Sequence, residues 1–140
     1  NPSSRYDYLS LALTARQKLL RSVWIGFNIE HTKRTDQYVG YNDYTRDSFG
    51  FEVHWAPGDR VDLEASGRYQ LYNYPNAFAF HNPLAGGKTR ESARISIIGS
   101  YRMTPQLSLI GEARFRETVS SDTRIQYERT QFIIGVRWEQ

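Results

Sequence analysis

Apolar and polar residues alternate along most of this chain, with the period of two that places successive side chains on opposite faces of a β-strand. No segment repeats its apolar residues at helical spacing. The alternation is found in seven segments, whose apolar faces run over Leu9–Leu13, Val23–Ile29, Phe49–Trp55, Val61–Leu71, Ala93–Tyr101, Leu107–Phe115 and Thr130–Trp138. We therefore predict an all-β chain of seven amphipathic strands.

The connections between these segments alternate in length. Three are predicted to be tight turns, at Arg16–Arg21, Ala56–Arg60 and Met103–Gln106. Three are predicted to be long and polar, at His31–Tyr44, Asn73–Thr89 and Glu117–Gln126. Tight turns at one end of a sheet and long loops at the other are typical of an antiparallel, up-and-down transmembrane β-barrel, with its turns in the periplasm. The last strand follows a long loop, which predicts a periplasmic C-terminus.

Composition favours a membrane barrel over a soluble one. Aromatic residues make up 14% of the chain, and aromatic side chains on the apolar faces are predicted near both strand ends, at Trp55, Tyr101, Trp138, Phe49 and Phe115. Those are the heights at which aromatic girdles meet lipid headgroups. A soluble lipocalin-like barrel or sandwich is the alternative, with its apolar face turned inward. The chain has no cysteine, which excludes disulfides, thiolate zinc sites and a cysteine nucleophile.

The number of strands bears on how a barrel would close. The first and last predicted strands run in the same direction, whereas a closed single-chain bacterial barrel has an even number of strands. We therefore expect residues 1–140 to form the C-terminal seven strands of a larger outer-membrane β-barrel domain. An eight-stranded barrel lacking one strand, or a barrel closed by several identical chains, are the alternatives.

The polar faces carry most of the charge, and in a barrel they would line the lumen. Acidic residues are concentrated on the second to fourth strands and basic residues on the fourth to seventh; the set is Glu30, Glu52, Asp62, Glu64, Arg68, Arg94, Arg102, Glu112, Arg114, Arg116, Arg129 and Arg137. Such an arrangement predicts a transverse field that biases ion passage. The alternative is that these charges only hydrate the wall and hold neighbouring strands together.

Two further patterns concern the loop end of the sheet. An arginine recurs about every 40 residues where a strand descends, at Arg5, Arg46, Arg90 and Arg129, and marks either a functional ring or simply hairpins of equal length. Aromatic residues are frequent near the same end and could stack on sugar rings: Tyr38, Tyr41, Tyr44, Tyr72, Tyr74, Phe78, Phe80 and Tyr127.

Catalytic and metal-binding patterns are weak. The three histidines are His31, His54 and His81, and the acidic pair Asp43 and Asp47 is their nearest partner in a hydrolase-like set. We therefore predict no enzymatic activity, no metal site and no cofactor. The net charge of +3 comes from arginines spread over several strands rather than from one outer patch, so nucleic-acid binding is not predicted.

The end of the chain carries a family resemblance. The stretch QFIIGVRW, with Phe132, Ile134, Gly135, Val136 and Trp138, resembles the C-terminal signal that the barrel-assembly machinery reads in Gram-negative outer-membrane proteins; it departs from that signal in ending Glu139-Gln140 rather than on the aromatic residue. Together with HWAPGDRVDLEASGRYQLYNY and YRMTPQLSLIGEARFRETVSSDTRIQYERT, it makes the chain similar to the C-terminal part of outer-membrane β-barrel porins found with exopolysaccharide-biosynthesis genes.

This resemblance implies a location in the outer membrane of a Gram-negative bacterium and porin-like passage or export of hydrophilic solutes or exopolysaccharide. It also implies contact with the lipid bilayer, lipopolysaccharide and the barrel-assembly machinery, and with polysaccharide or an export complex as further partners. The alternative function is a structural barrel with a plugged lumen, whose extracellular loops bind a partner. Conductance through a bilayer would separate the two.

Overall fold

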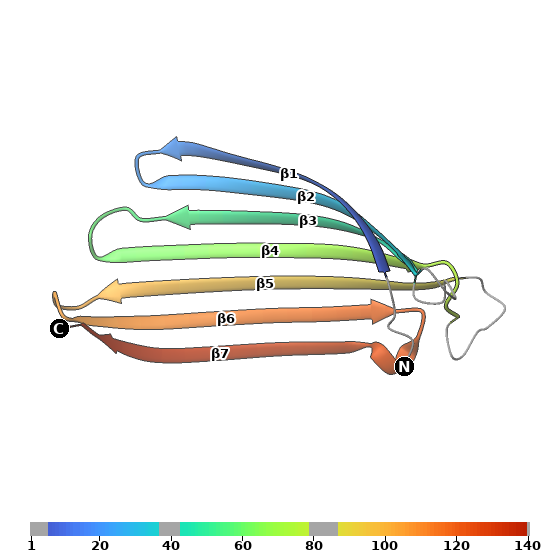
Figure 1. Cartoon of the computed structure of the whole chain (residues 1–140). Helices are drawn as coiled ribbons and strands as arrows, with labels where there is room; N and C mark the ends of the chain where they lie inside the picture. Colours follow the sequence, from blue (N-terminus) through green and yellow to red (C-terminus); the bar gives the residue numbers. More distant parts are fainter. Residues whose placement is uncertain (1–5, 37–42, 79–86, 140) are drawn as a thin grey trace.

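The computed structural model describes residues 6–36, 43–78 and 87–139, which form one antiparallel sheet (Figure 1). Its strands are β1 (Tyr6–Leu20), β2 (Val23–Asp36), β3 (Tyr44–Trp55), β4 (Val61–Tyr74), β5 (Lys88–Arg102), β6 (Leu107–Ser120) and β7 (Tyr127–Trp138). Each strand pairs with its neighbours in the sequence, in the order β1-β2-β3-β4-β5-β6-β7. The prediction of seven antiparallel, up-and-down strands is confirmed.

The ladder of strand pairs brings apolar residues opposite apolar residues across the whole sheet. Phe27 lies opposite Phe51, which lies opposite Gly67, and the same row continues through Ile95 to Phe115. Residues directly opposite share a face. The predicted division of each strand into an apolar and a polar face is therefore confirmed, although the polar face also carries apolar side chains, among them Trp24, Ile98, Ile110 and Ile133.

The strands are longer than the alternation predicted, and the connections are correspondingly shorter. β1 continues through the predicted turn to Leu20, after a register shift between Lys18 and Leu20, and only Arg21 and Ser22 remain as the turn. β2 and β6 likewise continue into their predicted loops, to Asp36 and Ser120. The reason is that backbone hydrogen bonds between strands continue through polar residues, where apolar alternation has already ended.

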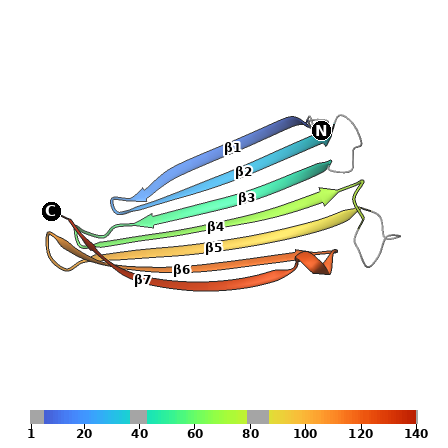
Figure 2. The same cartoon turned by 60° about the horizontal axis from the view of Figure 1, so that its bottom comes forward.

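The sheet is open (Figure 2). Within the described residues β1 and β7 are the two edge strands, and they do not pair with each other. This confirms the prediction that these seven strands do not close into a barrel by themselves. Because the strands alternate in direction, β1 and β7 run the same way, so joining them directly would require a parallel pair in an otherwise antiparallel sheet.

In contrast to an ordinary globular domain, this sheet buries mainly polar side chains and exposes most of its large apolar ones. The buried polar side chains are Thr32, Ser48, Ser92, Thr118, Ser120 and Asp122, whereas Ala77 is the only buried hydrophobic residue among those the structure describes. On the apolar face, Phe132 and Ile134 are 77% and 82% exposed. The described sheet therefore has no apolar core, and one of its faces exposes large apolar side chains, as surfaces that contact other apolar groups do.

Apolar side chains on this face also fill the space above glycines. The Cβ of any other residue at Gly67 would come within 2.2 Å of the Phe51 ring. Glycine at this position of β4 therefore lets the ring of Phe51 lie over the neighbouring strand. This contact packs one side chain against the neighbouring strand on the same face and does not form part of a buried core.

The apolar band crosses the sheet obliquely. Towards the loop end it reaches Leu9 on β1 but only Phe132 on β7, although Val119 on β6 still lies in the row of Leu71 and Leu11. The row that contains Phe132 reaches β1 at Gln17, eight residues beyond Leu9, after passing through Ala113, Ile97, Ala65, Val53 and Ile25. Its turn-side border shifts in the same sense: the row through Val23 on β2 reaches β7 at Ile134, four residues before Trp138.

The predicted aromatic girdle is only partly in place. Trp55, Tyr101 and Trp138 lie exposed on the apolar face near the tight turns. Phe49 and Phe115, which were predicted to lie near the loops, are close to the middle of their strands. That prediction was wrong because β3 begins at Tyr44 and β6 continues to Ser120, which moves the loop ends further away.

Candidate functional site

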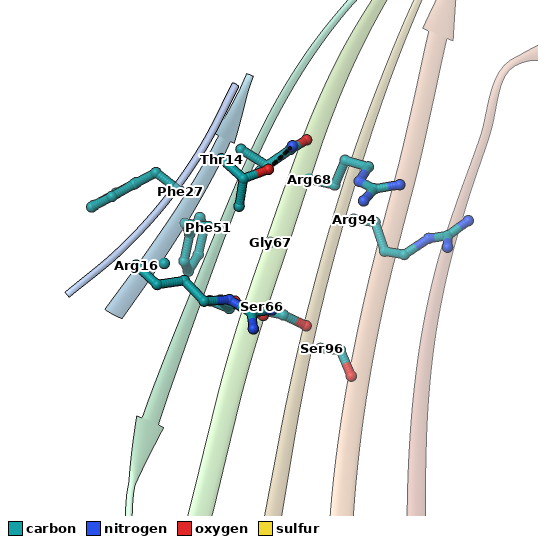
Figure 3. A pocket seen from close by; sticks show the side chains of 13 residues that line it. Thr14, Arg16, Phe27, Phe51, Ser66, Gly67, Arg68, Arg94 and Ser96 are labelled. Carbon is teal, nitrogen blue, oxygen red and sulfur yellow. Dashed lines mark hydrogen bonds and ion pairs between the residues drawn. The ribbon is translucent and has the colours of Figure 1, made fainter. Parts of the chain in front are cut away.

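The polar face of the sheet is hollowed. Two hollows of about 470 and 760 Å³ lie on it, and Arg94, Ser66 and Ser96 line both of them. Small residues line them, among them Gly26, Gly50, Ser66 and Ser96, and a separate row of buried Ser48, Ser92 and Thr118 crosses the same face nearer the loops. Figure 3 shows the side chains of Arg68 and Arg94 extending in the same direction from neighbouring strands, with Ser66 and Ser96 beside them.

Acidic side chains on β2, β3 and β4 are paired with basic ones. Arg46 donates to Glu30 at 2.5 Å, and Ser10 and Thr32 donate to the same carboxylate at 3.1 and 2.9 Å. Arg16 on β1 donates to Glu52 at 2.7 Å. Towards the tight turn, His54 and Asp62 form a third pair at 2.8 Å. The two arginine pairs neutralise Glu30 and Glu52, whereas Glu64 forms no ion pair among the described residues.

Arginines on β4–β7 form a single row. Arg68 lies opposite Arg94, Arg94 opposite Arg116, and Arg116 opposite Arg129. We call Arg68, Arg94, Arg116 and Arg129 the arginine row. None of the four forms an ion pair with a carboxylate among the residues that the structure describes, and Arg116 lies over the Tyr127 ring at 5.2 Å.

The acids near the arginine row are unavailable to it. Glu91, Glu117 and Glu128 lie on the opposite, apolar face, as their pairing with Leu71, Ala93 and Glu117 respectively shows. Glu112 lies on the polar face, but both of its carboxylate oxygens accept from Arg114. Four like charges in consecutive cross-strand positions repel one another unless they are solvated or an anion is present.

The magnitude of this repulsion depends on the surrounding medium. Two unit charges about 4 Å apart interact by about 1 kcal/mol in bulk water and by about 4 kcal/mol near a protein surface. Arg68, Arg94 and Arg129 are exposed, and Arg116 is partly buried. Water can therefore reach the row, and so can a solute that is small enough to enter the hollows.

All twelve residues of the predicted lumen-facing set lie on the polar face, but the structure brings together only some of them. Four form the arginine row, and Glu112 and Arg114 pair with each other. Arg102 and Arg137 lie on either side of Ser108 in a separate row at the turn end, and Glu64 lies opposite His54. The predicted basic side of the sheet is present, whereas on the acidic side arginines neutralise Glu30 and Glu52.

Sequence reasoning missed the bases that neutralise the acids. Arg16 was assigned to a turn, and Arg46 was considered only as part of the arginine repeat. Both continue the parity of the polar face, with Arg16 following Thr14 on β1 and Arg46 preceding Ser48 on β3. Continuing each alternation by one or two residues would have found them. Of the arginine repeat, Arg46 and Arg90 share a row through Tyr72, Arg129 lies in another row, and Arg5 lies outside the described residues.

Tyrosines at the loop end of the polar face form a cluster with cations. The rings of Tyr44, Tyr72 and Tyr74 lie 5.6–6.1 Å apart, with Tyr72 and Tyr74 stacked. Arg34 lies over Tyr44 at 4.6 Å, Lys88 over Tyr74 at 5.6 Å and Arg90 over Tyr72 at 5.0 Å. These ring faces are engaged by one another and by cations, which limits their use as sugar platforms.

The other aromatic residues proposed for sugar stacking are not part of this cluster. Phe78 is exposed after the end of β4, and Tyr127 lies under Arg116. Tyr38, Tyr41 and Phe80 lie outside the described residues.

The connection between β6 and β7 is held by one carboxylate. Asp122 precedes a 3₁₀ turn (η1, Thr123–Ile125) that the sequence did not predict, and it accepts from the backbone N–H and the guanidinium of Arg124. Lys88 Nζ lies 3.8 Å from the same carboxylate. The hydrogen bonds from Arg124, and the positive charges of Arg124 and Lys88, lower the pKa of Asp122 to about 2. This loop is therefore tied to the start of β5.

The remaining candidate groups show no catalytic arrangement among the described residues. His31 lies 2.6 Å from Asp47 on the apolar face, far in register from the His54–Asp62 pair, and His81 is not described. Over residues 6–36, 43–78 and 87–139, no three His, Asp or Glu side chains are gathered as metal ligands would be. That same part of the chain has no helix of the length and apolarity needed to cross a membrane.

The residues of the predicted C-terminal signal lie in β7 at the sheet edge. Phe132, Ile134, Val136 and Trp138 are exposed on the apolar face, and Gly135 lies on the polar face opposite Ile110. Comparison with protein-family models, with curated proteins and with solved structures finds no match to this chain. Its function is therefore argued from the geometry of the two faces.

Proposed function

We propose that this chain forms part of the wall of an outer-membrane β-barrel, and that the barrel is a pore for hydrophilic solutes. The observation that carries the proposal is the oblique apolar band. Strands of a membrane barrel are tilted by about 35–45° from the membrane normal, so a slab of lipid must cross them obliquely.

The slant of the band has the size that this tilt requires. Between the edge strands β1 and β7 the loop-side border differs by eight residues, although not in even steps, and the turn-side border shifts by four residues over five steps. With a rise of about 3.4 Å per residue and about 4.8 Å between strands, these shifts correspond to a tilt of roughly 30–45°.

The hollows support the same orientation. In a soluble barrel the apolar face lines the inside, and the charged face meets bulk water. Here the hollows, the buried serines and threonines and the arginine row all lie on the polar face, while Ile134 and Phe132 are exposed on the other. This distribution favours lipid outside and water inside.

A complete barrel on this proposal contains further strands that pair with β1 and β7 and continue the antiparallel order. Its polar face then lines an aqueous lumen. Hydrophilic solutes, including polysaccharide, are the class that such a lumen passes. Lipopolysaccharide and the barrel-assembly machinery remain the proposed partners, with the C-terminus in the periplasm.

Spin labels test which face meets lipid. Labels at Ile97, Leu109 and Val136 should be reached by lipid-soluble oxygen, and labels at Arg94 and Arg114 by a water-soluble quencher. The full-length protein in phospholipid vesicles is the sample, and electron paramagnetic resonance saturation is the measurement. The opposite accessibility pattern would show that the apolar face is turned inward and would end the proposal of a membrane barrel.

Planar-bilayer recording tests whether the barrel is open. A porin-like protein gives stepwise, salt-dependent conductance. If the spin labels report a membrane barrel while the bilayer shows no conductance, the plugged structural barrel with partner-binding loops replaces the pore.

A further inference from the structure

We infer that the arginine row is an anion-binding track, and that the solutes of the proposed pore carry carboxylate, phosphate or sulfate groups. The inference rests on the proposed pore for its transport role, but anion binding by the row can be tested separately. It starts from four cations in register, Arg68, Arg94, Arg116 and Arg129, none of which forms an ion pair among the described residues, since Glu52 and Glu112 beside the same hollows pair with Arg16 and Arg114.

The row has room for a ligand. Arg68 and Arg94 line the hollow of about 470 Å³, and Arg94, Arg116 and Arg129 line that of about 760 Å³. Arg94 belongs to both, so the two hollows meet along the row. The neighbouring rows offer short or neutral side chains, among them Ser92 and Thr118 on one side and Ser96 and Gln131 on the other.

The chemistry of the row selects anions. A guanidinium presents a planar set of N–H donors that matches the oxygens of carboxylate and phosphate, and it stays charged at any physiological pH. In the paired part of the sheet these donors are already used by Glu30 and Glu52. In the arginine row they face the hollows, so an incoming anion relieves the mutual repulsion and is bound in the same step.

If the strands are tilted as the apolar band indicates, the arginine row runs obliquely along the wall of the lumen and not around it at one height. A row of paired residues runs perpendicular to the strands, so strands tilted by roughly 40° carry it along the barrel axis as well as around the wall. Successive arginines are therefore offset both around the lumen and along it. Several adjacent sites of moderate affinity allow an anion to enter, to pass between sites and to leave.

Charge alternation provides the decisive variant. Arg94→Glu combined with Arg129→Glu converts the row into Arg-Glu-Arg-Glu, in which each acid can pair with its neighbours and the wall is not weakened. The matched control is Arg21→Glu with Arg60→Glu, which makes the same change in net charge in two exposed tight turns away from the row. Both variants use the full-length protein in the same lipid.

Reversal potentials in a potassium chloride gradient measure the transport role. We expect the parent protein and the turn control to prefer chloride over potassium several-fold at low salt, and less so at high salt, where screening shortens the field. The alternating variant should lose this preference. If the parent protein shows no anion preference, or the alternating variant behaves as the control does, the row is not a selective track.

Binding of inorganic pyrophosphate separates this inference from the proposed pore. Calorimetry in detergent micelles should show binding to the parent protein and the turn control, and loss of that binding in the alternating variant. A protein that binds pyrophosphate in this way but gives no conductance has the track without the pore. Equal binding, or none, in all three proteins would overturn the anion-binding role whatever the conductance.

Discussion

The two sides of the polar face treat charge differently. On β1–β3 and the turn end of β4, acids and bases alternate across strands and join as Arg16–Glu52, Arg46–Glu30 and His54–Asp62. Across β4–β7, four arginines follow one another in a single row without an acid partner among the described residues. The same strand architecture and the same alternation underlie both sides, so the difference lies in which residues the register brings opposite one another.

This difference separates charge that holds a wall from charge that is available to a ligand. A paired arginine has its donors occupied, and removing its partner leaves a half-buried charge without compensation. An arginine of the arginine row has arginines as its cross-strand neighbours, so its substitution leaves no acid without a partner. Substitution of an arginine on the polar face should therefore lower stability in β1–β3 and raise it in the arginine row. Substitutions on the apolar face should have the same effect in both parts of the sheet.

The largest effect is expected on the apolar face, equally on both sides. Phe27→Arg on β2 and Ile97→Arg on β5 each place a charge near the middle of the apolar band and should cost about 2–4 kcal/mol of unfolding free energy in a bilayer. Asn28→Arg and Ser96→Arg are the neighbouring controls on the polar face and should cost much less. Urea unfolding from phospholipid vesicles measures all four. Equal costs for neighbours of opposite parity would mean that lipid does not cover this face.

A smaller loss is expected when a pair is broken on the β1–β3 side. Glu30→Gln removes the charge that accepts from Arg46, whose side chain is 23% exposed, and should lower the unfolding free energy by about 1–2 kcal/mol. The exposed Glu139, near the end of the chain and 4.0 Å from Arg137, serves as the control for loss of one acid. If Glu30→Gln costs no more than Glu139→Gln, the pairs on this side do not stabilise the wall.

The opposite sign is expected in the arginine row. Arg94→Gln removes repulsion with both Arg68 and Arg116 and should raise the unfolding free energy by about 0.2–1 kcal/mol at low ionic strength. Salt should reduce this gain, because screening weakens the repulsion that the substitution relieves. Arg46→Gln on the other side should destabilise under the same conditions. A loss of stability in Arg94→Gln would contradict an uncompensated row.

The smallest effect is local and concerns the connection between β6 and β7. The pKa of Asp122 is lowered from 3.8 to about 2, so its contribution to stability is full above about pH 4 and is lost as the pH falls towards 2. Arg124→Gln removes the first cause of this shift, and carboxyl NMR titration should then find the pKa of Asp122 closer to 3.8. An unchanged pKa would show that Lys88 or the backbone N–H dominates.

Much of the architecture could be predicted from alternation, because a strand with one apolar face displays its period directly in the sequence. Strand ends were less predictable. Lys18 and Thr118 lie in strands although they are polar, since backbone pairing extends beyond the apolar band. The shorter predicted strands also misplaced Phe49 and Phe115 and left Arg16 and Arg46 out of the candidate site.

The face that each side chain occupies follows from strand parity alone, since parity survives any shift of register by two residues. The residues that lie opposite one another do not follow from parity, because registers that differ by two residues keep the same faces. They depend on the turns and the ladder of the folded sheet, which place Arg68, Arg94, Arg116 and Arg129 in one row and give Glu30 and Glu52 their partners. The apolar faces can therefore be predicted from the sequence, whereas the four arginines are brought into one row only by the register of strand pairing in the folded sheet.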